Sequence, residues 1–286
     1  MENTNKIMDS KPNYKIYCLY HNKVFSKYYG KQIDQVTLVK MDKGPYVFRA
    51  KKHIYLAKEK WFHPIGKEWA EYEFYYSLYQ GYKEGLIELP EYLCFIHYDM
   101  EFTSTNPEYG NTTVLDVIEK ELDRSRSFKD KIIAFIPHTF NHVYKNNSLV
   151  LDDLIAANNS YRDINLSKSY YEKRNLNQCG SFLFSREIFL NAMGFLEIFI
   201  KSKKFKTHNL KSRKEGVYAE FALSVYISSL GLSEIYFPLR HQYLTSENEI
   251  TVFDRIYKII GIIGLFINLR YPYIYKIIKP CFPDRK

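Results

Sequence analysis

Short apolar runs alternate with longer segments of helical periodicity through residue 240 of this chain. The apolar runs predict strands at residues 14–20, 35–40, 53–57, 92–96, 131–136, 181–184 and 235–237. Apolar side chains at spacings of three and four predict helices at residues 66–82, 111–122, 148–157, 186–200 and 216–230. Strands that alternate with helices favour an α/β fold, with a mixed, mostly parallel sheet flanked by helices.

The C-terminal segment, residues 251–286, has a different pattern. Its centre, residues 259–267, is uncharged and apolar, and lysine, arginine and tyrosine residues surround it. The run is shorter than the roughly 20 residues that span a bilayer. We expect an amphipathic helical extension that lies on an anionic membrane surface, with a helix packed on the core as the alternative. The predicted organisation is one domain at residues 1–250, followed by this extension.

Composition narrows the class of partner and the compartment. The formal net charge of +9 favours anionic partners such as phosphates, an anionic membrane or nucleic acid. The four cysteines lie far apart without a CxxC pair, which makes a zinc cage unlikely on sequence grounds. The first residues contain no apolar signal segment, so a cytoplasmic location is expected, including a peripheral position on the cytoplasmic face of the membrane.

The most informative stretch is the end of the apolar run at residues 92–96. It continues into His97, Tyr98, Asp99, Met100 and Glu101. Two carboxylates one residue apart, at the carboxyl end of a buried strand, suit a hard divalent cation, because ligands bind at that edge of an open α/β sheet. The alternative is that Asp99 and Glu101 cap a turn or pair with lysines.

Five segments in a fixed order resemble a known family. Residues 14–22, 68–79, 92–98, 179–189 and 215–227 are similar to segments of bacterial capsule and O-antigen glycosyltransferases, the domain-of-unknown-function 4422 group. The resemblance runs over residues 14–240 and implies a GT-A-like, Rossmann-like fold. It also implies a nucleotide-sugar donor, with a UDP-sugar expected first, and a surface-polysaccharide or lipid-linked glycan acceptor.

The metal site follows from a departure within this resemblance. That group usually continues the His-Tyr pair with two arginines, whereas Asp99 and Glu101 stand near that place here. The change resembles the Asp-x-Asp pattern of metal-dependent GT-A enzymes, in which Mn²⁺ or Mg²⁺ bridges the donor diphosphate. His241, after the last predicted strand, is the expected third ligand, and a surface histidine is its alternative.

Other site residues come from the strand ends and the late helices. Tyr20, His21 and Asn22 end the first strand and are expected to meet the nucleotide, and His97 is expected to be structural or to contact the donor. His138 and His142 are expected near the donor or acceptor. An inverting transferase needs a carboxylate base, for which Glu220 and Glu215 are the candidates and Asp163 is a rival. A carboxylate at a helix start is also a favourable partner of the helix dipole.

The sequence therefore predicts a glycosyltransferase that moves a sugar from a nucleotide-sugar to a glycan acceptor. The alternative is a noncatalytic, basic peripheral protein that binds anionic membrane or nucleic acid, supported by the charge and by the lysine-rich segment 201–214. No P-loop, GxGxxG or nucleophile-elbow motif is present. Because no nucleic-acid-binding signature supports the basic segment, no nucleic-acid partner is expected.

Overall fold

The structure is a computed structural model that describes residues 13–21, 35–41, 52–104, 106–124, 128–177, 180–202 and 214–241. Asn22 and the predicted extension at residues 251–286 lie outside these ranges. Within them, no helix is long and apolar enough to cross a membrane.

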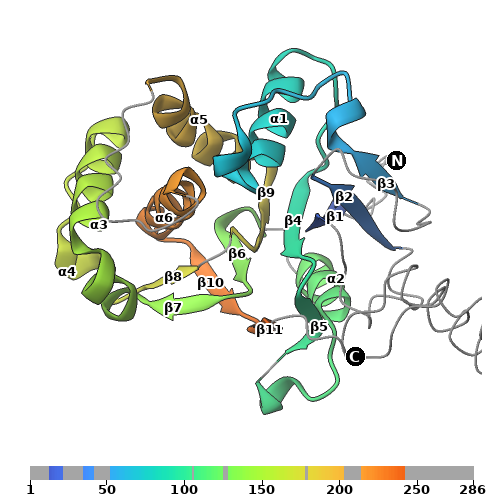
Figure 1. The fold of residues 1–286 in the computed structure, drawn as a ribbon. Helices are drawn as coiled ribbons and strands as arrows, with labels where there is room; N and C mark the ends of the chain where they lie inside the picture. The colour runs from blue at the N-terminus through green and yellow to red at the C-terminus, as the bar shows by residue number, and fades with distance from the viewer. Residues whose placement is uncertain are drawn as a thin grey trace, which may run out of the picture.

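A mixed sheet of seven strands forms the centre of the fold (Figure 1). Its order is β10 (Ser233–Tyr236), β6 (Lys131–Ala134), β9 (Phe182–Ser185), β4 (Tyr92–His97), β1 (Tyr14–Tyr20), β2 (Val36–Lys40) and β3 (His53–Tyr55). Only β9 is antiparallel to its neighbours, β4 and β6; every other pairing in this sheet is parallel. The carboxyl ends of the other six strands therefore meet at one edge, where β9 begins. The predicted mixed, mostly parallel sheet is confirmed.

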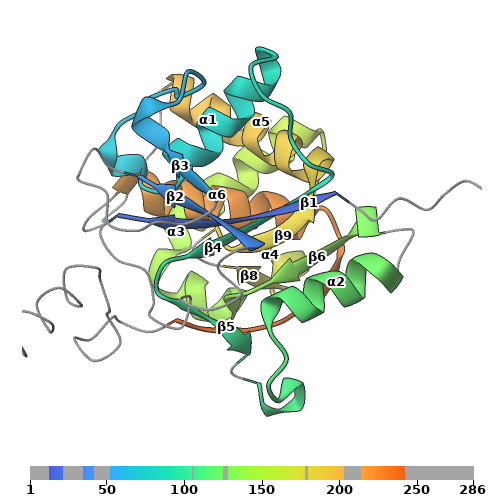
Figure 2. The ribbon, with the colours of Figure 1, turned by 90° about the vertical axis from the view of Figure 1, so that its right-hand side faces the viewer.

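Helices cover both faces of this sheet (Figure 2). They are α1 (Tyr72–Lys83), α2 (Val114–Arg124), α3 (Phe140–Arg162), α4 (Lys168–Tyr171), α5 (Arg186–Ser202) and α6 (Lys214–Ser229). One apolar cluster packs α1, α3, α5 and α6 on one face, and a second packs α2 on the other. In β1, Tyr17 and Leu19 belong to the first cluster while Cys18 and Tyr20 belong to the second. Successive side chains of an extended strand point to opposite faces of the sheet, and both faces of β1 are covered by helices. The C-terminal part of β1 is therefore apolar throughout.

Two small antiparallel sheets complete the fold and were not predicted. One pairs β5 (Met100–Ser104) with β11 (Leu239–His241), and the other pairs β7 (Pro137–Thr139) with β8 (Asn175–Asn177). Short 3₁₀ turns connect the larger elements at η3 (Leu56–Lys58), η4 (Lys67–Trp69), η5 (Pro107–Tyr109) and η6 (Phe128–Asp130). Strands of three residues are too short to show an alternating pattern of apolar and polar side chains. Whether such a segment forms a strand depends on the segment with which its backbone pairs.

Several predicted helices have different limits in the structure. The helix predicted at residues 66–82 begins only at Tyr72, because Ala70 has φ 50° and interrupts the helical backbone after η4. The helix predicted at residues 148–157 is the longer α3, which is non-helical at Asn147. The helix predicted from residue 111 begins after Thr113, whose side chain and that of Asp116 bond each other's backbone N–H groups in a capping box.

One half-buried carboxylate holds α1 against α5. Glu197 of α5 accepts hydrogen bonds from Tyr79 Oη at 3.1 Å and from Gln80 Nε2 at 2.5 Å, both on α1. Lys83 Nζ lies 3.3 Å and Lys201 Nζ lies 2.8 Å from its carboxylate. Burial by itself would raise the pKa of Glu197, but the bonds from Lys201, Gln80 and Lys83 outweigh burial and lower it to about 2.

We expect Glu197→Gln to lower the free energy of unfolding by about 1–2 kcal/mol near neutral pH, because charge-assisted bonds are lost. Solvent around the exposed ammonium groups of Lys83 and Lys201 keeps the loss small. The folded pKa, about 2, lies below the ordinary value of 4.5. The stabilisation is therefore present above about pH 4.5 and is lost as the pH falls through about 2. Urea unfolding measured across this range should show the difference between parent and variant shrinking toward acid pH.

The matched control is Glu187→Gln, which changes an exposed glutamate on the same helix. It should alter stability by no more than about 0.5 kcal/mol. A Glu197→Gln loss of the same size at every pH would contradict the role given to this carboxylate.

Candidate functional site

The candidate site lies at the sheet edge where β1, β2 and β4 end. In the register of these strands, Tyr20 lies beside Lys40 and Leu19 lies beside His97. The backbone N–H of Tyr98 donates to the carbonyl of Leu19 at 3.1 Å, so the pairing continues one residue beyond β4. The turn that follows His97 is therefore attached to the end of β1.

A buried lysine lies at this edge. Lys40 ends β2 and has no exposed surface. Its Nζ donates to the backbone carbonyl of His21 at 2.7 Å and lies 5.5 Å from the ring centroid of Tyr20. Lys40 was not among the predicted site residues, although a lysine that ends an otherwise apolar run is a signal in the sequence. It places a cation directly behind the residues expected to meet a nucleotide.

The predicted nucleotide contacts take different positions. The ring of Tyr20 is fully buried, and its hydroxyl lies 2.6 Å from Nε2 of His53. His21 is half-buried, with its carbonyl bound by Lys40. Tyr20 is thus an interior residue beneath this edge, and the nucleotide-binding role of Tyr20, His21 and Asn22 stays a prediction.

His97 is nearly enclosed at the end of β4. It is 6% exposed, and its Nδ1 lies 4.0 Å from a carboxylate oxygen of Glu71, just before α1. Its backbone N–H donates to the sulfur of the fully buried Met100 at 3.4 Å. Glu71 thus lies beside the imidazole, and the bond to Met100 holds the backbone at the end of β4. The structural or donor-contacting role of His97 stays a prediction.

Asp99 follows in the turn between β4 and β5. Its side chain is half-buried, and its charge lies close enough to add to the effect of burial in raising the pKa of the Cys18 thiol. β5 begins at the next residue and pairs with β11, so that His241 lies opposite Met100 in the register. The backbone thus brings the position of His241 next to the stretch from Asp99 to Glu101, which lies 140 to 142 residues away in the sequence.

The side chains of Glu101 and His241 lie outside the residues that the structure describes, and only their backbone is placed by the pairing of β5 with β11. Among the side chains that are described, no group of three or more His, Cys, Asp or Glu could hold a metal ion. The metal role of Asp99, Glu101 and His241 stays a prediction.

Both predicted bases lie on α6, which starts beside η4. A Cβ atom built on Gly216 would lie 3.1 Å from the carbonyl oxygen of Glu68, so the helix approaches η4 closely. Farther along, Ser224 Oγ donates to the carbonyl of Asn177 in β8, and Ser228 Oγ donates to that of Asn175 at 2.9 Å. Glu220 precedes Ser224 by four residues and therefore shares this helix face. Glu220 and Glu215 are both half-buried, and both stay predicted bases.

The remaining candidates lie around α3. His138 of β7 and His142 of α3 stack, with ring centroids 5.8 Å apart. Burial, followed by the charge of His142, lowers the pKa of His138. Asp163, the rival base, is the exposed residue that ends α3 in a left-handed conformation with φ 52°.

Comparison with known proteins bears on the fold. No family model matches the chain, and no curated protein matches its sequence. Among solved structures, the bifunctional glycosyltransferase WbbM in its apo form superimposes with a TM-score of 0.52 at 12% identity, covering 79% of this chain and 44% of the WbbM chain. This chain thus spans less than half the length of WbbM.

A second solved structure gives a weaker superposition. It is glucosyl-3-phosphoglycerate synthase from Mycobacterium tuberculosis in complex with Mn²⁺, UDP and glucosyl-3-phosphoglycerate, with a TM-score of 0.37, 11% identity, and coverage of 82% of this chain and 74% of that chain. The chain has a GT-A-like fold, as the resemblance implied. The narrower likeness to the capsule and O-antigen group stays a prediction.

Gly180 lies two residues before β9 at the candidate edge and has φ 59°, a conformation that favours glycine. A Cβ atom there would lie 3.0 Å from the hydroxyl of Tyr72 and 3.0 Å from Cε2 of Tyr75. Tyr75 also donates from its hydroxyl to the Gly180 carbonyl at 3.2 Å. Both tyrosines are buried on α1, so neither can move aside without disturbing the core.

Gly180→Ala should lower the free energy of unfolding by about 2–4 kcal/mol, as the sum of backbone strain and overpacking. Gly110→Ala is the matched control, because Gly110 has φ 53° but open space around its Cβ position. It should lose only the strain contribution of about 1–2 kcal/mol. Equal losses in the two variants, measured by urea unfolding, would contradict the close packing of Gly180 on α1.

Proposed function

We propose that this protein is a glycosyltransferase that moves a sugar from a nucleotide-sugar donor, with UDP as the first nucleotide to test, to a glycan or lipid-linked glycan acceptor. The observation that carries the proposal is the pairing of β5 with β11. It brings His241 beside the stretch from Asp99 to Glu101 at the carboxyl edge of a GT-A-like sheet. That edge is where an open α/β sheet binds ligands.

The donor set of the proposed site fits a hard divalent cation. Asp99, Glu101 and His241 would supply carboxylate and imidazole ligands to Mn²⁺ or Mg²⁺. The half-buried position of Asp99 in the turn after β4 supports this assignment, because a carboxylate there can face a ligand while the preceding residue, Tyr98, is hydrogen-bonded to Leu19 of β1. When bound, the cation would stabilise negative charge on the departing nucleotide diphosphate.

The chain's own residues would position the two substrates. Lys40 holds the carbonyl of His21 and adds positive charge behind the nucleotide edge. The contact between His97 and Glu71 holds the imidazole in one orientation. For an inverting reaction, Glu220 or Glu215 of α6 would take the proton of the attacking acceptor hydroxyl.

A panel of nucleotide-sugars incubated with Mn²⁺ tests the proposal. At least one donor should be hydrolysed or transferred, and Asp99→Asn should lower kcat/KM by at least about 100-fold, because electrostatic stabilisation of the leaving group is lost. Asp99→Asn should also weaken Mn²⁺ binding measured by electron paramagnetic resonance. Asp130→Asn, an exposed carboxylate just before β6 and thus at the opposite sheet edge, should change neither quantity.

The proposal fails if no donor binds or turns over and Asp99→Asn binds Mn²⁺ like the parent. That result would favour the noncatalytic alternative, a basic peripheral protein. In an active preparation, Glu220→Gln and Glu215→Gln identify the base, since only the true base variant should lose transfer while keeping donor affinity.

A peripheral position on an anionic membrane is part of the same proposal. It is supported by the net charge of +9 and by the basic and aromatic residues around the apolar run at residues 259–267. The full chain should sediment with liposomes that contain anionic lipid, and a chain ended at residue 250 should bind at least about tenfold less. Liposomes of zwitterionic lipid alone are the control; unchanged binding of the shortened chain would contradict a membrane role for residues 251–286.

A further inference from the structure

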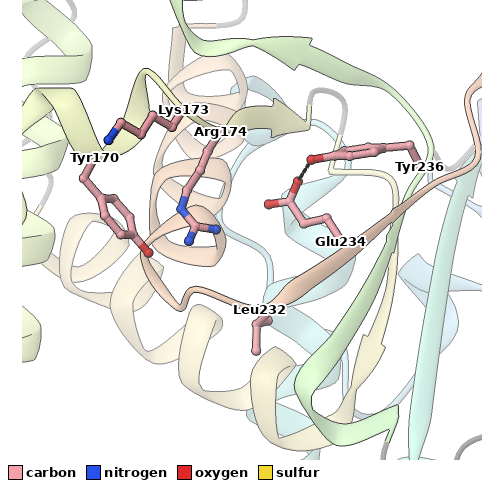
Figure 3. Close-up of a pocket in the computed structure, with 6 residues that line it drawn as sticks. All are labelled: Tyr170, Lys173, Arg174, Leu232, Glu234 and Tyr236. Atoms are coloured by element: carbon pink, nitrogen blue, oxygen red, sulfur yellow. Dashed lines mark hydrogen bonds between the residues drawn. The ribbon is translucent and has the colours of Figure 1, made fainter.

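A polar cavity lies away from the donor edge, beside the edge strand β10 (Figure 3). Its volume of about 410 Å³ falls within the range of roughly 300–1,000 Å³ that is typical of small-molecule sites. Its walls are Tyr170, Lys173, Arg174, Leu232, Glu234 and Tyr236. In the sheet order β10 is three strands from β4, or about 14 Å at roughly 4.8 Å per strand. The cavity is therefore separate from the stretch that contains Asp99.

Arg174 is held in place before any ligand binds. Its backbone N–H donates to the carbonyl of Tyr171 at 2.9 Å, and its carbonyl accepts from the N–H of Phe140 at 3.2 Å. Its guanidinium carbon lies 4.5 Å from the ring centroid of Tyr170, whose hydroxyl donates to the carbonyl of Ser228 at 3.4 Å. Backbone and aromatic contacts thus fix this arginine between α4 and β8, which lowers the entropy that a ligand must remove.

The opposite wall carries a carboxylate and a phenol. Glu234 and Tyr236 are two residues apart on β10 and so share one face of the strand, and the Tyr236 hydroxyl donates to the Glu234 carboxylate. Burial raises the pKa of Glu234, and burial followed by the bond to Glu234 raises the pKa of Tyr236 to about 12. Figure 3 shows Arg174 and Glu234 pointing toward one another across the cavity. They form no ion pair with any residue that the structure describes.

These walls select a class of ligand. The net charge of the cavity walls is +1, because two cationic residues, Lys173 and Arg174, outnumber the one carboxylate, Glu234. A guanidinium fork binds a carboxylate or phosphate through two parallel bonds. Tyrosine rings offer an apolar face to the C–H groups of a sugar, and the carboxylate of Glu234 accepts bonds from hydroxyl groups. A bare anion would be repelled by Glu234, and a neutral sugar would leave Arg174 without an anionic partner.

We propose that this cavity binds an anionic sugar unit, one that carries a carboxylate or a phosphate, as a part of the acceptor glycan remote from the reacting hydroxyl. The acceptor role rests on the proposed function, whereas binding of the sugar does not. The ring lies between the two tyrosines, the anionic group meets Arg174 and Lys173, and ring hydroxyls donate to Glu234.

Isothermal titration calorimetry without a nucleotide-sugar tests this site, with glucuronic acid, glucose 6-phosphate, glucose and inorganic phosphate as probes. Glucuronic acid or glucose 6-phosphate should bind at least about tenfold tighter than glucose and than inorganic phosphate. Arg174→Gln should remove that preference, with a loss of about tenfold or more that reflects one charge-assisted bidentate contact. Lys145→Gln, an exposed lysine of α3 with the same change in net charge, should bind like the parent.

Lys173→Gln is the second variant; because Lys173 is exposed, it should fold normally and weaken anionic sugars by a few fold. Equal affinity for inorganic phosphate and the anionic sugars would identify a simple anion site and overturn the proposal. Binding that neither Arg174→Gln nor Lys173→Gln weakens, or no binding of any probe, would overturn it as well. Since no donor is present, a failure of glycosyl transfer in the Asp99 experiment leaves this result unaffected, and the two failures are distinguishable.

Discussion

Parallel pairing of β1 with both β2 and β4 is the constraint on which the rest of the structure depends. It aligns the ends of three strands, so that Tyr20 is the register partner of Lys40 and the preceding residue, Leu19, is the register partner of His97. In a parallel sheet the connections cross over its faces, and the carboxyl ends collect polar residues at one edge. The buried ammonium of Lys40 and the enclosed imidazole of His97 are acceptable there because His21 and Glu71 supply oxygen partners.

The antiparallel strand β9 extends this edge. Because β9 runs against β4 and β6, its first residue, Phe182, lies beside Ala134 at the end of β6, and Gly180 leads into β9 against Tyr75. β5 then continues from the end of β4 and is met by β11 from far along the chain. The result is a GT-A-like sheet with a polar edge assembled from distant segments, and a separate polar cavity beside its edge strand β10.

The sequence predicted the large elements well and the small ones poorly. β1 was predicted with its observed limits, because a strand that is buried on both faces is a nearly continuous apolar run. A helix with one exposed face would instead contain regularly spaced polar residues. The strands β5, β7, β8 and β11 went unpredicted, since each acquires its backbone partners only from a distant segment. Lys40 was missed for a related reason: a lysine at a strand end looks solvated until the fold encloses it. Arg174 and Glu234 drew no attention because neither belongs to a local motif.

By itself the sequence determined the alternation of strands and helices and the mostly parallel sheet, because apolar periodicity is a local property. Only the tertiary structure decided that β9 is reversed, that His241 lies opposite Met100, and that Arg174 faces Glu234 across a cavity. These depend on pairing between segments far apart in the chain, where the free energy of burial and hydrogen bonding selects one register among many that the sequence would permit.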